Sequence, residues 1–264
     1  MRASLLALLT ASAMGLGPSS GSGQGPALTD EWTQLFNGRD LSGWTPKIAG
    51  YAFGQNHANT FRVADGMIQV RYDQYDELHS QFGHLFYATP FSSFHLAIEY
   101  RFVGTAAKGT PDWAIENSGV MIHSQPPRTM TRAQDFPISI EVQFLGGLPD
   151  GKPRPTANMC SPGTEVDIDG RQARAHCVNS RSKTYPLDEW VRVEVIVRGD
   201  TSITHIVNGD TVMTYAHPRV GGGVVTGYDP AVKVDGTPLT GGYIALQSEG
   251  HPIDFRKVEI RRPR

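Results

Sequence analysis

The sequence lacks a convincing amphipathic helix of three or more turns, and this absence limits the fold class. Parallel α/β architectures need helical crossovers between neighbouring strands, so a doubly wound sheet is not expected. The Gly-x-Gly-x-x-Gly fingerprint and the His-Glu-x-x-His helix are also missing. The common nucleotide-binding and zinc-protease interpretations therefore have no support in the sequence.

Long hydrophobic runs and clustered charges are scarce as well. No apolar run approaches the ~20 residues that a membrane-spanning helix needs. Lys and Arg are scattered, only 19% of the residues are charged, and the formal net charge is -2. This composition is typical of an ordinary globular protein, and we expect neither a nucleic-acid partner nor stable membrane insertion.

The first residues predict export. Arg2 gives a positive start, residues 3–9 form a short apolar core, and residues 11–13 offer a small-residue cleavage site. We expect residues 1–25 to be a signal peptide with a flexible Ser/Gly-rich linker, and residues 26–264 to be a single domain. The mature protein would then be periplasmic or extracellular.

Strict alternation of apolar and polar residues is the dominant pattern in the rest of the chain. It predicts strands over 94–102, 138–144, 190–197 and 203–207, each with one apolar face and one largely polar face. Asn208-Gly209 permits the positive φ angles of a tight hairpin. The sequence therefore predicts an all-β fold, an antiparallel β-sandwich whose apolar faces meet in the core.

Long segments without clear periodicity separate these strands. They cover 72–82, 125–136, 146–179 and 217–239 and are too long for simple turns. Loops of that length usually carry function or form the wall of a site. We therefore expect a ligand site bounded by these loops.

Two cysteines, Cys160 and Cys177, lie within the third of these segments. In an exported protein such a pair favours a disulfide, which would contribute roughly 3 kcal/mol in the chain-entropy model. The rival interpretation is a metal pair with His176, although this spacing is not a standard zinc pattern.

Six motifs occur in an order that resembles one family. They are Leu35–Trp44, Phe61–Met67, Asn117–His123, Glu141–Gln143, His205–Gly209 and Leu246–Val258. Together they resemble the DUF1080 family, also called the 3-keto-disaccharide hydrolase domain, from about Trp32 to Ile260. The resemblance implies a concanavalin A-like jelly-roll sandwich that is secreted in bacteria and acts on glycosides oxidised at the sugar C3. One branch of the family also has a Cys-x-Pro-Gly-Thr segment before a His-Cys pair, as here.

The implied substrate defines the chemistry to look for. A 3-keto group acidifies the C2 proton, so the C1 oxygen can leave by elimination, with water added afterwards. This route needs a base near C2, a proton donor to the departing oxygen and a group that polarises the ketone. Direct hydrolysis by paired carboxylates is the competing mechanism.

Strand parity provides the candidate residues. Glu141 and Gln143 project from the non-core face of their strand, and His123 has the parity to join them, although a solvated outer face would show the same pattern. Gln247 and Glu249 share a face near the C-terminus, which His251 joins if the strand continues. The expected catalytic residues are Glu141, His123, Glu249 and His251, and the expected substrate-binding residues are Gln143, Gln247, Asn117, Trp113 and His205.

His205 shares the parity of Ile203 and Val207, which argues for a packed histidine, whereas the resemblance to the family keeps it as a candidate. Among the tryptophans, Trp44 and Trp190 are expected in the core, and Trp113 is expected to be exposed where a sugar ring could stack on it. The spacing of the acidic and histidine residues neither supports nor excludes a divalent cation, so no cofactor is assigned.

Three functions remain in view, and the least favoured is a structural adhesion or scaffold domain of the cell envelope, which would show an exposed apolar patch. The first is a glycoside-cleaving enzyme that acts on 3-keto-disaccharides. The alternative is a carbohydrate-binding module without catalysis, since this fold hosts many lectins. A carbohydrate is the expected ligand of both the enzyme and the binding module.

Overall fold

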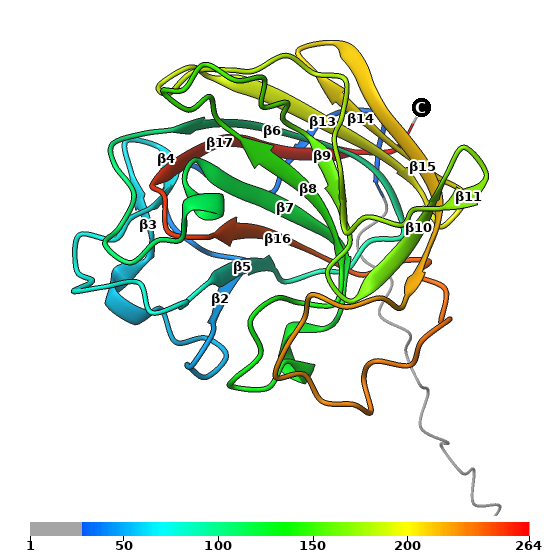
Figure 1. Cartoon of the computed structure of the whole chain (residues 1–264), viewed down its shortest axis with the longest axis horizontal. Coiled ribbons are helices and arrows are strands. Elements are labelled where there is room, and N and C mark those ends of the chain that lie inside the picture. Colours follow the sequence, from blue (N-terminus) through cyan, green and yellow to red (C-terminus); the bar gives the residue numbers. More distant parts are fainter. Residues whose placement is uncertain (1–27, 264) are drawn as a thin grey trace, which may run out of the picture.

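The alternating segments form two antiparallel sheets that pack face to face (Figure 1). The computed structural model describes residues 28–263, so the expected signal peptide lies outside the described residues. The seven-stranded sheet has the order β12-β9-β8-β7-β16-β5-β2. The ten-stranded sheet has the order β11-β10-β15-β14-β13-β6-β17-β4-β3, with β1 added beside β17. The expected concanavalin A-like jelly-roll sandwich is confirmed.

The strands differ widely in length. The seven-stranded sheet contains β2 (Trp44–Ile48), β5 (Gly83–Tyr87), β7 (Asn117–Ser124), β8 (Ile140–Leu145), β9 (Asn158–Cys160), β12 (Cys177–Val178) and β16 (Tyr243–Ser248). The ten-stranded sheet contains β1 (Thr33–Gln34), β3 (Phe61–Ala64), β4 (Met67–Val70), β6 (Ser93–Phe102), β10 (Thr164–Ile168), β11 (Arg171–Gln172), β13 (Val191–Arg198), β14 (Ser202–Val207), β15 (Asp210–Val220) and β17 (Ile253–Arg261).

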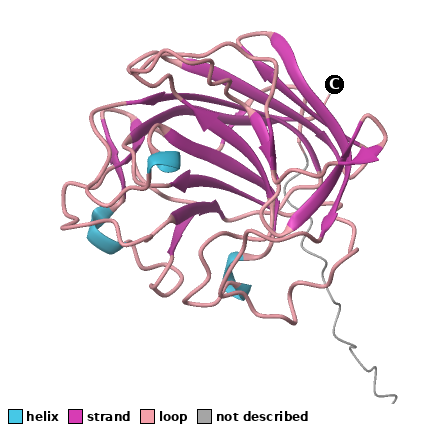
Figure 2. Cartoon of the chain, viewed as in Figure 1, coloured by secondary structure: helices cyan, strands magenta, loops and turns pink. Residues whose placement is uncertain are grey.

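Helical structure in the described part of the chain is limited to three short 3-10 turns (Figure 2). They are η1 (His57–Asn59), η2 (Asp112–Ala114) and η3 (Pro127–Thr129). None of the helices in residues 28–263 has the length and apolar character needed to cross a membrane.

Local sequence explains most of these elements. The hairpin between β14 and β15 turns at Asn208-Gly209, where both residues have the predicted positive φ, 48° and 96°. The segment 146–179, expected to be irregular, instead contains β9 to β12. These four strands have two to five residues each, too short for a period-2 pattern to stand out.

The core lies between the two sheets. Apolar residues of β6, β13 and β17 face those of β7, β8 and β16, and the members of this cluster include Ile98, Val193, Phe255, Val120, Val142 and Leu246, all at most 1% exposed. Full burial of one such side chain stabilises the fold by roughly 1.5–3 kcal/mol. The alternation that predicted the sandwich is thus the pattern that forms this core.

Trp190 is a correction to the expected core. It lies on the outer face of the ten-stranded sheet, with the Arg256 guanidinium carbon 3.9 Å and the Arg101 guanidinium carbon 4.7 Å from its ring. Trp190 precedes Val191, the first apolar residue of β13, and so has the opposite parity to the buried valines. Trp44, in contrast, is buried as predicted.

The outer face of the seven-stranded sheet is largely covered by loops. Every residue of β7 is buried, although only alternate ones face the sandwich core. On the outer face Met121, Phe86 and Ala245 form a small apolar cluster with Met130 from the loop after β7. The remaining part of this face carries polar side chains, and the candidate site lies there.

Candidate active site

A cavity of about 340 Å³ lies over the polar part of the outer face of the seven-stranded sheet. Its lining combines polar groups from the sheet with apolar and aromatic groups from the loops: Trp113, Asn117, Phe136, Glu141, Gln143, Pro162, His176, Cys177, Val224 and Glu249. This combination is typical of a small-molecule site. Of the expected site residues, the structure brings Glu141, Glu249, Gln143, Asn117 and Trp113 together here.

A larger cavity of about 1200 Å³ lies elsewhere and is lined by His123 and residues of the 237–243 loop. Its described lining residues include no carboxylic acid. We therefore place the chemistry in the smaller cavity, where the titratable groups with perturbed pKa values gather.

The alternation of β8 places Glu141 and Gln143 on the outer face, while Ile140 and Val142 enter the core. Glu141 pairs in register with Met121 of β7, and Gln143 pairs with Gly119. A Cβ atom at Gly119 would lie 3.0 Å from Glu141 Oε1. The missing side chain at Gly119 thus leaves the space that the Glu141 carboxyl group occupies.

Glu141 and Glu249 form a buried carboxyl pair. They are 5% and 3% exposed, and no Lys, Arg or His among residues 28–263 forms an ion pair with either. Burial raises the pKa of both carboxyl groups, and the charge of Glu249 raises the pKa of Glu141 further. The protons of two such groups are therefore released by the pair in successive steps rather than by each residue independently.

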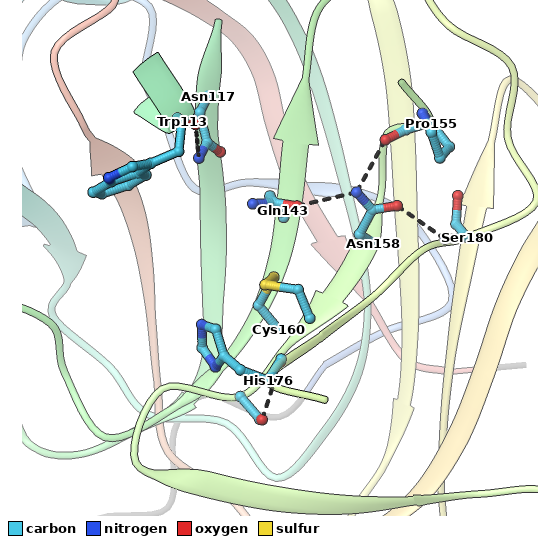
Figure 3. The surroundings of a disulfide bond; sticks show 10 residues. Trp113, Asn117, Gln143, Pro155, Asn158, Cys160, His176 and Ser180 are labelled. Atoms are coloured by element: carbon cyan, nitrogen blue, oxygen red, sulfur yellow. Dashed lines mark hydrogen bonds between the residues drawn. A yellow bond between two sulfur atoms is a disulfide. The ribbon is translucent and has the colours of Figure 1, made fainter. Parts of the chain in front are cut away.

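Two amides next to this pair are held in fixed orientations. Asn158 Nδ2 donates to Gln143 Oε1 at 3.0 Å, which leaves the Gln143 NH₂ group on the side away from Asn158 (Figure 3). Asn117 Nδ2 donates to the Trp113 carbonyl at 3.1 Å. Asn117 Oδ1 is buried with no hydrogen-bond partner in the described part of the chain. One amide can therefore donate to a ligand hydroxyl, and the other can accept from one.

Aromatic side chains form one wall of the cavity. Trp113, carried by η2, is 54% exposed, as expected from the sequence. Its ring centroid lies 5.5 Å from that of Phe82, which stacks on Phe136 at 5.3 Å. An exposed indole at a cavity mouth offers an apolar surface on which the face of a sugar ring can pack.

The disulfide between Cys160 and Cys177 is confirmed and lies at the edge of the same cavity (Figure 3). Cys160 pairs in register with Glu141, and Cys177 contributes to the lining together with His176. The two sulfur atoms and one ring nitrogen of His176 lie within 4.8 Å of one another. Because both sulfurs are consumed in the disulfide, they are not available as thiolate ligands, and we assign no metal here.

His123 and His251 lie outside the cavity. His123 has φ 49°, which breaks the alternation of β7, and its Nε2 lies 2.9 Å from the Gly199 carbonyl oxygen. At Gly250, φ is 109°, so the chain turns after Glu249 and the strand does not continue to His251. The His251 ring packs on Phe102 of the ten-stranded sheet, with ring centroids 5.6 Å apart. His123 therefore does not join the polar face of Glu141 and Gln143, and the continued strand that would have placed His251 beside Gln247 and Glu249 is not present.

His205 is a packed histidine, as its parity indicated. It is fully buried, and its Nδ1 and Nε2 lie 2.9 Å from the Ala157 carbonyl oxygen and the Tyr215 hydroxyl. It lies in the ten-stranded sheet, away from the cavity lining. Its hydrogen bonds leave neither ring nitrogen for a substrate.

Gln247 and His84 lie on the same outer face as Glu249, and both are fully buried. The two pair in register between β16 and β5. Neither side chain has a hydrogen-bond partner among residues 28–263, and each such buried polar atom costs roughly 1–3 kcal/mol. The sequence reasoning missed His84, although the alternation of Gly83–Tyr87 would have placed it beside Phe86 on one face.

Sequence and structure comparisons identify the family and the fold. The model of the 3-keto-alpha-glucoside-1,2-lyase-like domain matches residues 31–261. A search of curated proteins found no match.

Two crystal structures of candidate glycosyl hydrolases from Parabacteroides distasonis ATCC 8503 are similar in fold. One is 17% identical with a TM-score of 0.50, and the match covers 88% of this chain and 94% of the other. The second is 16% identical with a TM-score of 0.52, covering 88% and 100%. The match over most of its length shows that the chain belongs to the family of 3-keto-alpha-glucoside-1,2-lyase-like domains.

Proposed function

We propose that the protein is an exported enzyme that cleaves 3-keto-glycosides by proton transfer at C2. The observation that carries the proposal is the buried pair Glu141 and Glu249, whose pKa values are both raised, at a cavity with an exposed tryptophan. Membership of the family supports the oxidised-sugar substrate class. The disulfide supports export, since such bonds persist mainly in oxidising compartments.

The reaction needs one group that accepts a proton and one that donates a proton. In the singly protonated pair, the ionised carboxylate removes the C2 proton of the 3-keto sugar, and the C1–O bond breaks as the C1–C2 double bond forms. The protonated partner donates its proton to the departing glycosidic oxygen. Addition of water across the double bond then gives the free 3-keto sugar, so that the net reaction is hydrolysis.

The environment of the two carboxyl groups favours this route over direct hydrolysis. Glycosidases that use two carboxylic acids keep one pKa raised and the other group ionised as nucleophile or base. Here burial raises the pKa of both Glu141 and Glu249. A raised pKa makes the ionised form a stronger base toward a carbon acid, which suits removal of the C2 proton.

The remaining residues of the cavity position the sugar. Gln143 donates to one hydroxyl, Asn117 Oδ1 accepts from another, and Trp113 packs against the apolar face of a ring. The roles of Gln143 and Asn117 follow from the orientations that Asn158 and the Trp113 carbonyl impose on the two amides.

The experiment is incubation of the purified protein with a 3-keto-disaccharide and, separately, with the unoxidised disaccharide. We expect release of a 3-keto monosaccharide from the first only, because only the ketone acidifies C2. Equal cleavage of both would contradict the proton-transfer route. Binding of either sugar with no product after long incubation would instead support a non-catalytic carbohydrate-binding module.

A further inference from the structure

We infer that the reacting ring binds in an inner subsite beneath Phe136, where His84 and Gln247 contact it and His84 donates a hydrogen bond to the ketone oxygen. The inference rests on the proposed function and deepens it, because it names the third group that the elimination requires. The ligand class is a keto-sugar ring, whose carbonyl accepts and whose hydroxyls both donate and accept.

The strand register places these side chains in one row next to the carboxyl pair. Gln247 lies on the outer face of β16, and Glu249, which lines the cavity, directly follows the end of this strand at Ser248. His84 is the cross-strand neighbour of Gln247, and Lys47 is the next residue in the row. Side chains that pair directly across antiparallel strands have Cβ atoms roughly 4.5–5.5 Å apart. The row therefore extends the polar floor of the cavity by two strands.

His84 and the equally buried His205 differ in their hydrogen bonds. His84 and His205 are both fully buried, and His205 has a partner at each ring nitrogen. Both ring nitrogens of His84 lack a partner within the described residues. The same is true of the Gln247 amide nitrogen and oxygen and of Glu249 Oε2. Five such atoms in adjacent positions provide the donors and acceptors that a polyhydroxylated ring would use.

Phe136 lies between His84 and the open cavity. Its ring centroid lies 5.9 Å from that of His84, edge to face, and the residue is partly exposed and lines the cavity. The backbone around it is held in place, because Gln134 Nε2 donates to the Phe136 carbonyl and to Gln125 Oε1 at 2.8 Å each. A ligand in the cavity would therefore reach His84 by rotation of the Phe136 side chain rather than by movement of the loop.

The protonation state of His84 suits hydrogen bonding to a ketone. Burial and the neighbouring Lys47 lower the pKa of His84 to about 3, so the ring is neutral at physiological pH. A neutral imidazole carries one N–H donor. Directed at the ketone oxygen, this donor stabilises the negative charge that develops there when the C2 proton leaves.

The test combines activity with stability in His84→Leu, His84→Gln and Gln247→Leu. We expect His84→Leu to lower kcat at least 100-fold on a 3-keto-disaccharide. His84→Gln, which keeps an N–H donor, should retain at least ten times more activity than His84→Leu. The melting temperature of His84→Leu should stay equal or rise, because an unpartnered buried polar group is replaced by an apolar one. The matched control is His217→Asn, since His217 is exposed and lies on β15 beside Asp167.

Unchanged kcat in His84→Leu and Gln247→Leu would overturn the inner subsite and leave the proposed function standing. A binding measurement tests the inner subsite independently of the proposed function. Imidazole resonances of His84 in the wild-type protein should shift when 3-keto-glucose is added, and those of His205 should not. If no 3-keto-glycoside is cleaved but this shift occurs, the proposed function fails and the subsite stands. If the shift is absent, the subsite is overturned.

Discussion

Both sheets carry glutamates on their outer faces, but these glutamates have cationic partners on only one of the two sheets. On the ten-stranded sheet, Glu194 lies 2.7 Å from His95 and 3.0 Å from Arg192, and Glu99 pairs with Arg256 at 2.7 Å. On the seven-stranded sheet, Glu141 and Glu249 have no cationic partner among residues 28–263. On the ten-stranded sheet, the charge of the partner offsets the free-energy cost of burying each carboxylate. Glu141 and Glu249 have no such compensation.

The pKa values of the paired and unpaired glutamates shift in opposite directions. The hydrogen bond from His95 is the largest of several contributions that lower the pKa of Glu194 to about 2. Burial raises the pKa of Glu141 and Glu249. Paired charges on a sheet surface belong to the stability of the fold, while buried carboxyl groups that keep their protons are characteristic of catalytic sites.

The largest expected effect is on catalysis. We expect Glu141→Gln and Glu249→Gln each to lower kcat on a 3-keto-disaccharide at least 1000-fold, since acid–base catalysis contributes about 10²–10⁴-fold. The matched substitution on the other sheet, Glu194→Gln, should leave kcat within about twofold, because no reacting group lies there. Steady-state product release measures all three. Equal losses in all three variants would remove the distinction between the two faces.

A smaller effect is expected at the cavity mouth. Trp113→Ala removes the exposed ring on which the sugar packs, and should raise KM about tenfold, equivalent to about 1.4 kcal/mol of binding. The kcat should change little, because Trp113 touches no reacting atom. Trp190→Ala, at the guanidinium-flanked tryptophan of the other face, is the control and should leave KM unchanged. A loss confined to kcat in Trp113→Ala would contradict a binding role.

The stability of the fold should respond to pH with opposite sign on the two faces. A raised carboxyl pKa favours the folded state below the unfolded pKa of 4.5, and this advantage is lost as pH rises through the folded pKa. Glu249→Gln should therefore raise the melting temperature by roughly 3–6 °C at pH 8 and by less at pH 4.5. Thermal unfolding at the two pH values measures the difference. A melting temperature that falls more at pH 8 than at pH 4.5 would contradict the assignment.

Glu194→Gln should show the reverse dependence and the smallest effect. Its lowered pKa stabilises the fold above the unfolded value of 4.5, and that contribution is lost as pH falls through about 2. The variant should lose about 0.5–1 kcal/mol at pH 7, the range of a partly exposed ion pair. The loss should shrink as the pH is lowered toward 2. A loss that grew with acidity would show that the network around Arg192 does not depend on this charge.

Alternation was enough to predict the sandwich and the outward placement of Glu141 and Gln143. It failed for His123, where a positive φ breaks the alternation without a clear sequence signal, and it does not extend to His251, because the chain turns at Gly250. The position of Glu249 beside Glu141 depends on the pairing of β16 with β7 and of β7 with β8. Strand order of this kind is set by the whole core, so the carboxyl pair and the burial of His84 emerge only in three dimensions.

The most direct test of the account is cleavage of a 3-keto-disaccharide in deuterated water, with 3-keto-glucose incubated alone as a control for exchange in solution. If Glu141 and Glu249 act by proton transfer at C2, the released 3-keto sugar will carry deuterium at C2 above the control, and Glu249→Gln will release little product. Cleavage by the wild-type protein with no deuterium at C2 would contradict the account and indicate direct hydrolysis.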